Sequence, residues 1–235
     1  MVKQITFLLA MCLCSGCADG PFYAIKRANP YFQAEFRRDR ELGPTFEDRL
    51  GEMQKLESTI TRMDPSKQAL WADRLEQIIR DDSSSELRAR AVAAVASIQT
   101  ESALRALNAA SADEVEKVRL AACQAWKKRG DTAARDMLLS LATKADETTS
   151  VRQAAIESLS AFDEAEVRSA LALLLEDRSP AVQYQVAQSL KTMTGQDFGG
   201  DFEKWKQFMA GENPDPPTPK SMSAAIWESL PSWRR

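Results

Sequence analysis

Residues 113–122 read Asp-Glu-Val-Glu-Lys-Val-Arg-Leu-Ala-Ala and contain the pattern that decides the fold. In this pattern an Asp is followed, after four intervening residues, by Val or Leu and then usually by Arg. Four copies occur, and their Leu or Val residues lie 31, 33 and 31 residues apart: Asp82 with Leu87, Asp113 with Val118, Asp146 with Val151, and Asp177 with Val182. A repeat of this length is typical of solenoids of stacked helix pairs. The chain is therefore expected to be all-α, without a single central cleft.

The residues after each Leu or Val predict one buried and one outward helical face. The positions four, five and eight residues further are apolar in every copy, which places them on one side of a helix. They are Ala91, Val92 and Val95; Ala122, Cys123 and Trp126; Ala155, Ile156 and Leu159; and Val186, Ala187 and Leu190. The opposite positions are mostly polar, and we expect them to meet solvent or a partner.

This recurring combination of Asp, Val or Leu, Arg and Ala resembles HEAT repeats over about residues 64–194. The resemblance implies a short right-handed α-solenoid of about four repeats, with an N-terminal helix and a C-terminal capping helix. It also implies a structural ladder of acids and arginines between neighbouring repeats, although the last copy has Gln183 in place of Arg. By resemblance, the ladder residues are Asp82, Asp113, Asp146 and Asp177 with Arg88, Arg119 and Arg152.

The pattern also predicts where the helices lie. An apolar stripe indicates a helix over 44–62, and Asp201 is placed to cap a short final helix after the glycines near residue 200. The sequence shows no alternating β-branched runs, so we expect no strands. The first helices are expected at about 65–80, 101–110, 131–144 and 163–176, and the second helices at about 86–99, 115–129, 149–161 and 180–194.

Residues 1–16 have the layout of a secretory signal peptide, with Lys3 ahead of a short apolar run. That run is shorter than the roughly 20 residues that a membrane-spanning helix needs. The stretch Leu13-Cys14-Ser15-Gly16-Cys17 resembles the lipobox of bacterial lipoproteins, except that Cys14 stands where Leu is usual. The resemblance implies acylation of Cys17 and a membrane-anchored lipoprotein of the cell envelope that faces the periplasm. Without acylation, the protein would be soluble in the periplasm.

The remaining chain divides into three parts by composition. Residues 17–43 are expected to be a lipidated N-terminus and tether, and residues 44–210 the solenoid. Residues 211–235 contain four prolines and then a short aromatic segment with a basic end, so they read as a linker and tail. The sequence leaves open whether this tail is disordered or docks on a partner or a membrane surface.

Composition excludes several kinds of chemistry. The chain has no histidine, which removes His-based acid–base catalysis and His-ligated metal sites, and we expect no cofactor. Removing Lys3 with the signal leaves 30 basic and 34 acidic residues, a net charge of −4, which argues against a nucleic-acid partner. Cys123 aligns with apolar residues in the other repeats, so we expect it to be a small buried hydrophobe rather than a reactive thiol.

The helix expected at 86–98 is apolar nearly all round, because Ala89, Ala93 and Ala96 occupy its outward positions. A helix of this kind is usually buried on every side. Either the N-terminal segment folds over it, which the apolar stripe of 44–62 favours, or a partner does.

These observations favour a non-catalytic scaffold that binds a protein partner along the second helices. Tyr184 is the expected anchor, because Tyr is enriched at binding hot spots. Two alternatives remain: an accessory enzyme or lyase-like helical-repeat protein, and a structural spacer that contacts the cell wall or membrane. The expected contact row consists of Gln124, Lys127, Gln153, Glu157, Tyr184 and Gln188.

Overall fold

The structure is a computed structural model that describes residues 38, 41 and 43–215. Its contacts divide the chain into two compact units, Met1–Glu52 and Met53–Arg235. Every regular element in the described part is a helix. The signal peptide, Cys17 and the tail from residue 216 onward lie outside the described residues.

The first described helix, α4 (Phe46–Thr59), begins in the first unit. Its start is fixed by a reciprocal pair of hydrogen bonds, in which the Asp48 amide donates to Thr45 Oγ1 and the Thr45 amide donates to the Asp48 carboxylate, each at 3.2 Å. This arrangement is a capping box, and it satisfies two amides that the first turn of a helix otherwise leaves free. A short 3₁₀ helix, η1 (Ile60–Arg62), follows α4 in the second unit.

In the described part of the second unit, the end of α4 and η1 are followed by four helix pairs and a final helix, as the repeat pattern predicts. The second helices start within two residues of the expected positions, because each signature Leu or Val opens a helix. The largest difference is α6, which ends at Val95 instead of near residue 99. The pairs are α5 (Pro65–Asp81) with α6 (Ser85–Val95), α7 (Glu101–Ser111) with α8 (Glu116–Arg129), α9 (Thr132–Thr143) with α10 (Thr149–Leu159), and α11 (Ala165–Leu174) with α12 (Pro180–Thr194), followed by α13 (Phe202–Met209).

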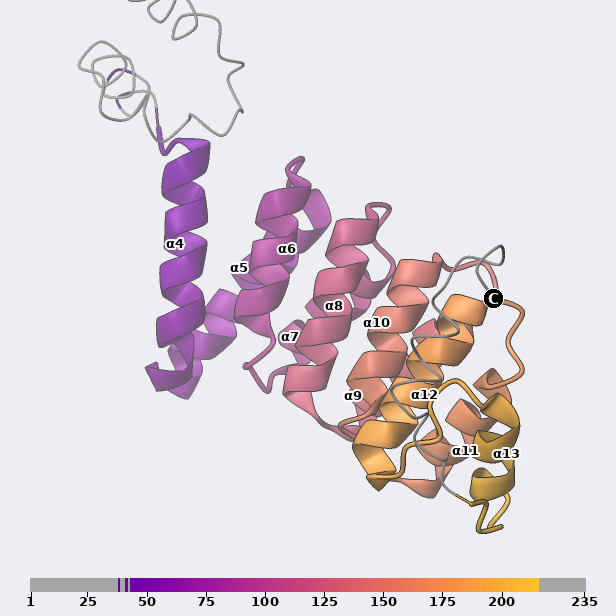
Figure 1. The fold of residues 1–235 in the computed structure, drawn as a ribbon. Coiled ribbons are helices and arrows are strands. Elements are labelled where there is room, and N and C mark those ends of the chain that lie inside the picture. Colours follow the sequence, from indigo (N-terminus) through magenta and orange to yellow (C-terminus); the bar gives the residue numbers. More distant parts are fainter. Residues whose placement is uncertain (1–37, 39–40, 42, 216–235) are drawn as a thin grey trace, which may run out of the picture. The chain divides into compact units, whose positions relative to one another are not determined.

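The helix pairs stack in two layers (Figure 1). The second helices α6, α8, α10 and α12 lie side by side, and each packs on the next. The first helices α7, α9 and α11 lie behind them. In this layer α5 packs on α7, and α11 packs on α9 and α13. The second unit is therefore a solenoid of helix pairs, the architecture expected from the sequence.

The core lies between the two layers. All twelve second-helix positions predicted to be apolar and inward are buried, with exposures of 0 or 1%. Trp126 is the largest of them, and its indole N–H donates to Ser111 Oγ at 2.8 Å. A buried indole needs such a partner, because an unpaired buried donor costs about 1–3 kcal/mol. The inward face of the second helices therefore supplies a continuous hydrophobic core.

An aromatic cluster closes the C-terminal end of the solenoid. The last pair ends at Gly195, which adopts the left-handed conformation that residues other than glycine rarely take. Asp201 then caps α13 by accepting the Lys204 amide at 3.2 Å, as predicted. Trp205 is fully buried, and its ring lies 5.0 Å from Phe198 in an edge-to-face arrangement. The helix α13 thus covers apolar surface that the last repeat would otherwise expose.

Candidate functional site

A ladder of ion pairs joins neighbouring repeats. Arg88 on α6 donates two hydrogen bonds of 2.8 Å to Asp113, and both side chains are only 7% exposed. The same guanidinium donates to the Asp82 carbonyl in its own turn at 2.8 Å. Arg152 pairs in the same way with Asp177, 25 residues further along the chain. Its backbone partner is the Ala142 carbonyl near the end of α9, at 2.9 Å, so each of these two arginines links its own repeat to the turn of the next.

The middle rung of the ladder corrects the prediction for Asp146. Arg119 pairs with Glu147, at 2.9 Å and 3.1 Å, and not with Asp146. Asp146 is 81% exposed, and its ion pair is a long one of 3.9 Å to Lys144. Glu147 lies one residue nearer to α10 than Asp146 does. Its side chain is also one methylene longer than that of an aspartate, and it reaches Arg119 from there. The repeat register placed the acid in the correct turn but at the wrong residue.

The acids in these turns do not supply the side-chain N-caps of the second helices. The N-cap hydrogen bonds of α6 and α10 come from Ser84 and Thr148. Asp177 instead accepts the amide of Ser179 at 2.9 Å and the guanidinium of Arg152. The hydrogen bond from Arg152 is the largest of the interactions that lower the pKa of Asp177. Asp177 is therefore a structural group that Arg152 and the Ser179 amide keep ionised.

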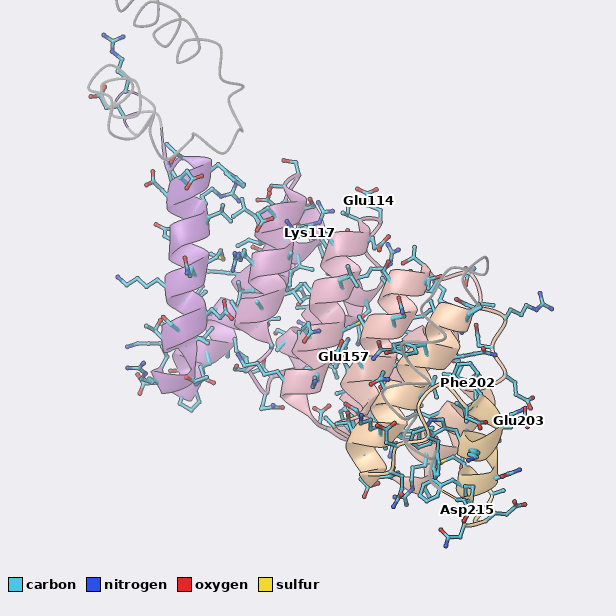
Figure 2. The ribbon with its side chains drawn as sticks, viewed as in Figure 1. Glu114, Lys117, Glu157, Phe202, Glu203 and Asp215 are labelled. Carbon is cyan, nitrogen blue, oxygen red and sulfur yellow. The ribbon has the colours of Figure 1, made fainter. Side chains whose placement is uncertain are left out.

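The predicted contact row lies on the outward face of the second helices. Gln124 and Glu157 are exposed, Tyr184 is 55% exposed, and Lys127 and Gln188 are half-buried. Figure 2 is drawn from the side on which the second helices lie in front, and it shows Glu157 on this face. Gln153 is half-buried, and its amide already donates to the Ala181 carbonyl of the next repeat at 3.1 Å. The other five side chains make no hydrogen bond to another repeat in the described part of the chain. Their polar ends therefore stay available.

A hollow of about 560 Å³ adjoins this row between α6 and α8. Lys127, Lys128 and Glu57 line its polar side, and neither lysine has an ion-pair partner in the described part of the chain. Its apolar side consists of Ala93, Ala96, Ala121 and Ala125. The outward alanines of α6 are thus only partly covered: Ala96 is buried, whereas Ala89 and Ala93 are half-buried.

Cys123 is buried, as predicted. Its Sγ lies 3.9 Å from the Val151 carbonyl oxygen, and the side chain is fully enclosed. Burial raises the pKa of the Cys123 thiol to about 12. The thiol is therefore protonated at neutral pH and does not serve as a nucleophile, because the thiolate is the reactive form.

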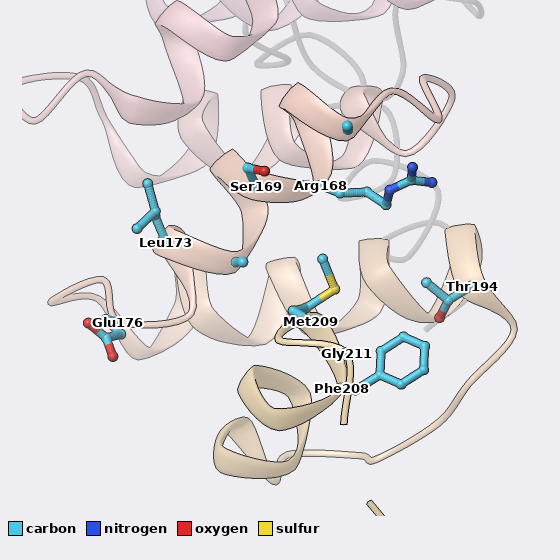
Figure 3. A pocket seen from close by; sticks show the side chains of 10 residues that line it. Arg168, Ser169, Leu173, Glu176, Thr194, Phe208, Met209 and Gly211 are labelled. Atoms are coloured by element: carbon cyan, nitrogen blue, oxygen red, sulfur yellow. The ribbon is translucent and has the colours of Figure 1, made fainter. Parts of the chain in front are cut away.

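A second hollow, which the sequence did not indicate, lies between α11 and α13 (Figure 3). Its volume is about 760 Å³, and one face of α11 forms a wall. Leu173 projects into solvent there with 77% of its surface exposed, opposite the half-buried Phe208 and Met209. On α11, three small residues and Leu173 line the hollow, and this combination is the one sequence signal that could have revealed it. The small residues are Ala165, Ser169 and Ala172.

Two further features, a metal-ligand cluster and a membrane-spanning helix, are absent from the described residues. No three His, Cys, Asp or Glu side chains among these residues converge as metal ligands would. Within the same residues, no helix combines the length and the hydropathy needed to cross a bilayer.

Comparison with known proteins bears on the repeat architecture. The model of a family described as HEAT repeats matches residues 72–149 and 138–199, which together span more than half of the chain. No curated protein matches the sequence.

Among solved structures, human deoxyhypusine hydroxylase in complex with glycerol is similar at 21% identity and a TM-score of 0.48. The alignment covers 53% of this chain and 44% of the hydroxylase, so it spans less than half of that enzyme. A similarity at this level carries no argument about activity.

Proposed function

The chain belongs to the HEAT-repeat family, and from this premise we propose that it is a non-catalytic scaffold that binds a protein partner along its second helices. A solenoid holds a row of side chains at fixed spacing on rigid helices, so a partner can lie along several repeats at once. Ordering this face on binding costs little, because the core of the second unit already fixes the helices.

The observation that carries the proposal is the set of side chains left available on this face. Tyr184 is an exposed aromatic residue, of the type that most often anchors protein interfaces. Lys127 and Glu157 carry opposite charges, and neither has an ion-pair partner among the described residues. A partner can therefore pair with both charges without breaking a bond within the solenoid.

The chemistry of the chain supports a role without catalysis. The whole sequence lacks histidine, and burial keeps the thiol of Cys123 protonated. The lowered pKa of Asp177 in the ladder is explained by the structural Arg152. None of these groups forms the pair of a nucleophile and a general base that covalent catalysis needs.

A capture experiment tests the partner surface. The lipidated protein is crosslinked in its native envelope, and a triple variant (Lys127→Glu, Glu157→Lys, Tyr184→Ala) is compared with the wild type. We expect captured proteins to fall at least about tenfold, since losing a hot spot costs 2 kcal/mol or more. The control variant carries matched changes on the first helices: Asn108→Glu, Ser140→Lys and Leu70→Ala.

Equal capture by the wild type and the triple variant would reject this face as the binding surface. Equal losses in the triple variant and the control variant would show a general effect of surface substitution. Circular dichroism of all three proteins checks that the helices remain folded.

We also propose that an acyl group on Cys17 anchors the scaffold in the bacterial envelope. The support is the Ser-Gly-Cys sequence at the end of a signal-like segment. Two or more acyl chains give stable anchoring, because each buried CH₂ contributes about 0.8 kcal/mol.

Metabolic labelling with an alkyne fatty acid tests the anchor. We expect the wild type and Cys14→Ser to incorporate label and to remain in the membrane fraction. Cys17→Ser should incorporate none and should leave that fraction. Labelling of Cys17→Ser at the level of the wild type would contradict the assignment.

A further inference from the structure

The hollow between α11 and α13 is the larger of the two hollows described above, and the contact row does not use it. Leu173, on its wall, is the most exposed of the large apolar side chains in the described residues. Covering so exposed an apolar side chain is favourable, because it removes apolar surface from water. Phe208 and Met209 provide further apolar surface from α13.

The described chain ends beside this hollow. Gly211 is part of its lining, and Asp215 lies only four residues further along. The Lys204 side chain donates to the Asp215 carbonyl at 2.9 Å, which holds this last described stretch against α13. The following 20 residues, 216–235, therefore start within about 15 Å of the hollow, since a chain spans at most 3.3–3.6 Å per residue.

The sequence of those residues has the pattern of a small amphipathic helix. Met222, Ile226 and Leu230 recur every four residues, with Trp227 beside them, and Pro231 follows. Three prolines (Pro216, Pro217 and Pro219) separate this segment from Asp215. The apolar segment spans nine residues, Met222–Leu230, and so does the wall of α11 from Ala165 to Leu173. A helix of nine residues is about 13 Å long, so the two lengths match.

Charge also favours this occupant. Glu164 and Glu166 at the start of α11 are exposed, next to the Ala165 end of the hollow, and Glu166 already has a long ion pair of 3.6 Å with Arg135. The chain finishes with Arg234 and Arg235. A tail that starts near Gly211 and runs antiparallel to α11 brings these arginines toward the two glutamates.

We propose that residues 222–230 of the same chain dock in the hollow between α11 and α13 and cover Leu173. Because the tail is tethered, its effective concentration at the hollow is in the millimolar range, so weak contacts suffice to keep it bound. The docked segment fills the space between α11 and α13. This inference concerns the first-helix side, so it stands or falls separately from partner binding by the second helices.

Disulfide trapping in the full chain tests the docking. Cys12, Cys14 and Cys17 are replaced by serine, and the buried Cys123 is retained. Leu173→Cys is combined with Met222→Cys, because Met222 lies opposite Leu173 when the segment runs antiparallel to α11. Mild oxidation is followed by mass spectrometry of the tryptic peptides. The matched control combines Leu70→Cys with Met222→Cys, because Leu70 is also an exposed leucine of a first helix, 64% exposed on α5.

We expect the 173–222 disulfide to form within one chain at least about fiftyfold faster than the 70–222 disulfide, reflecting the higher local concentration of a docked tail. In denaturant the difference should shrink to about fivefold, which is the advantage of the shorter loop in an unfolded chain. A difference in the folded protein no larger than that in denaturant would overturn the proposal. Disulfide-linked dimers would also overturn it, because they would assign the hollow to a second copy.

Hydrogen exchange provides a second measurement without new thiols. Amides of residues 222–230 should exchange slowly in the otherwise unchanged chain and at random-coil rates in Leu173→Glu. Leu70→Glu should leave their protection unchanged. Random-coil exchange of these amides in the wild type would reject the docked tail.

Discussion

At the scale of single residues, the ladder shows that only one of two adjacent acids makes the pairing between repeats. Arg119 makes its ion pair with Glu147, whose side chain is only 3% exposed, whereas Asp146 is exposed to solvent. Buried hydrogen bonds to charged groups contribute more to stability than exposed ion pairs do. Two adjacent acids in the same turn should therefore differ strongly in their importance.

Glu147→Gln should lower the free energy of unfolding by about 2 kcal/mol, the typical worth of a buried hydrogen bond to a charged group. Asp146→Asn should cause no measurable change, because solvent already surrounds that carboxylate. Urea unfolding followed by circular dichroism measures both variants. If Asp146→Asn were the more destabilising of the two, the pairing of Arg119 would be misassigned.

At the scale of helices, the turn before α12 couples stability to pH. The hydrogen bond from Arg152 lowers the pKa of Asp177 below its ordinary value of 3.8, and the Ser179 amide adds to this effect. The unfolded chain therefore takes up a proton at a higher pH than the folded chain does. The stabilisation is present above the ordinary pKa and is lost as pH falls through the lowered value.

The thermal midpoint of the wild type should consequently fall on acidification from about pH 5 toward pH 2. Asp177→Asn should start from a lower midpoint at neutral pH and decline less steeply, because it has no carboxylate to protonate. Glu86 and Asp197 also have lowered pKa values, so the comparison of the two slopes isolates Asp177. Parallel slopes would remove Asp177 from the acid response.

At the scale of the whole second unit, stability depends mainly on contacts between neighbouring helix pairs. The capping helix α13 packs against α11 and α12, and its buried Trp205 is the centre of the aromatic cluster. In such an array, damage at one end should spread only to the adjacent repeats. A single globular core would transmit the damage throughout.

Trp205→Ala should destabilise the C-terminal end by about 3–5 kcal/mol, the usual cost of removing a buried aromatic side chain. Amide exchange should accelerate most in α11 and α12, and least in α5 and α6. Mass spectrometry of peptides after timed exchange measures this gradient. Uniform acceleration along the chain would show that the second unit unfolds as one cooperative block.

The same scale separates the two surfaces that we propose. The contact row lies on the second helices, whereas the hollow around Leu173 lies on the first-helix side. A partner on one surface need not displace the tail from the other.

The sequence by itself determined the helix pairs, their approximate ends and the buried face of every second helix. These features follow from local periodicity: a 3.6-residue helix places positions four, five and eight residues apart on one side, and the repeat multiplies that pattern. The burial of Cys123 was predictable for the same reason, because its equivalents Val92 and Ile156 are apolar. The outward position of Tyr184 followed from the same alignment.

Only the tertiary structure decided how one repeat meets the next. The choice of Glu147 over Asp146 depends on the path of a turn and on the reach of a side chain, which spacing along the chain does not encode. The hollow beside Leu173 arises because α13 is short and leaves one face of α11 uncovered. Contacts within a helix are set by neighbouring residues, whereas contacts between helices 25 or more residues apart depend on how the whole stack packs.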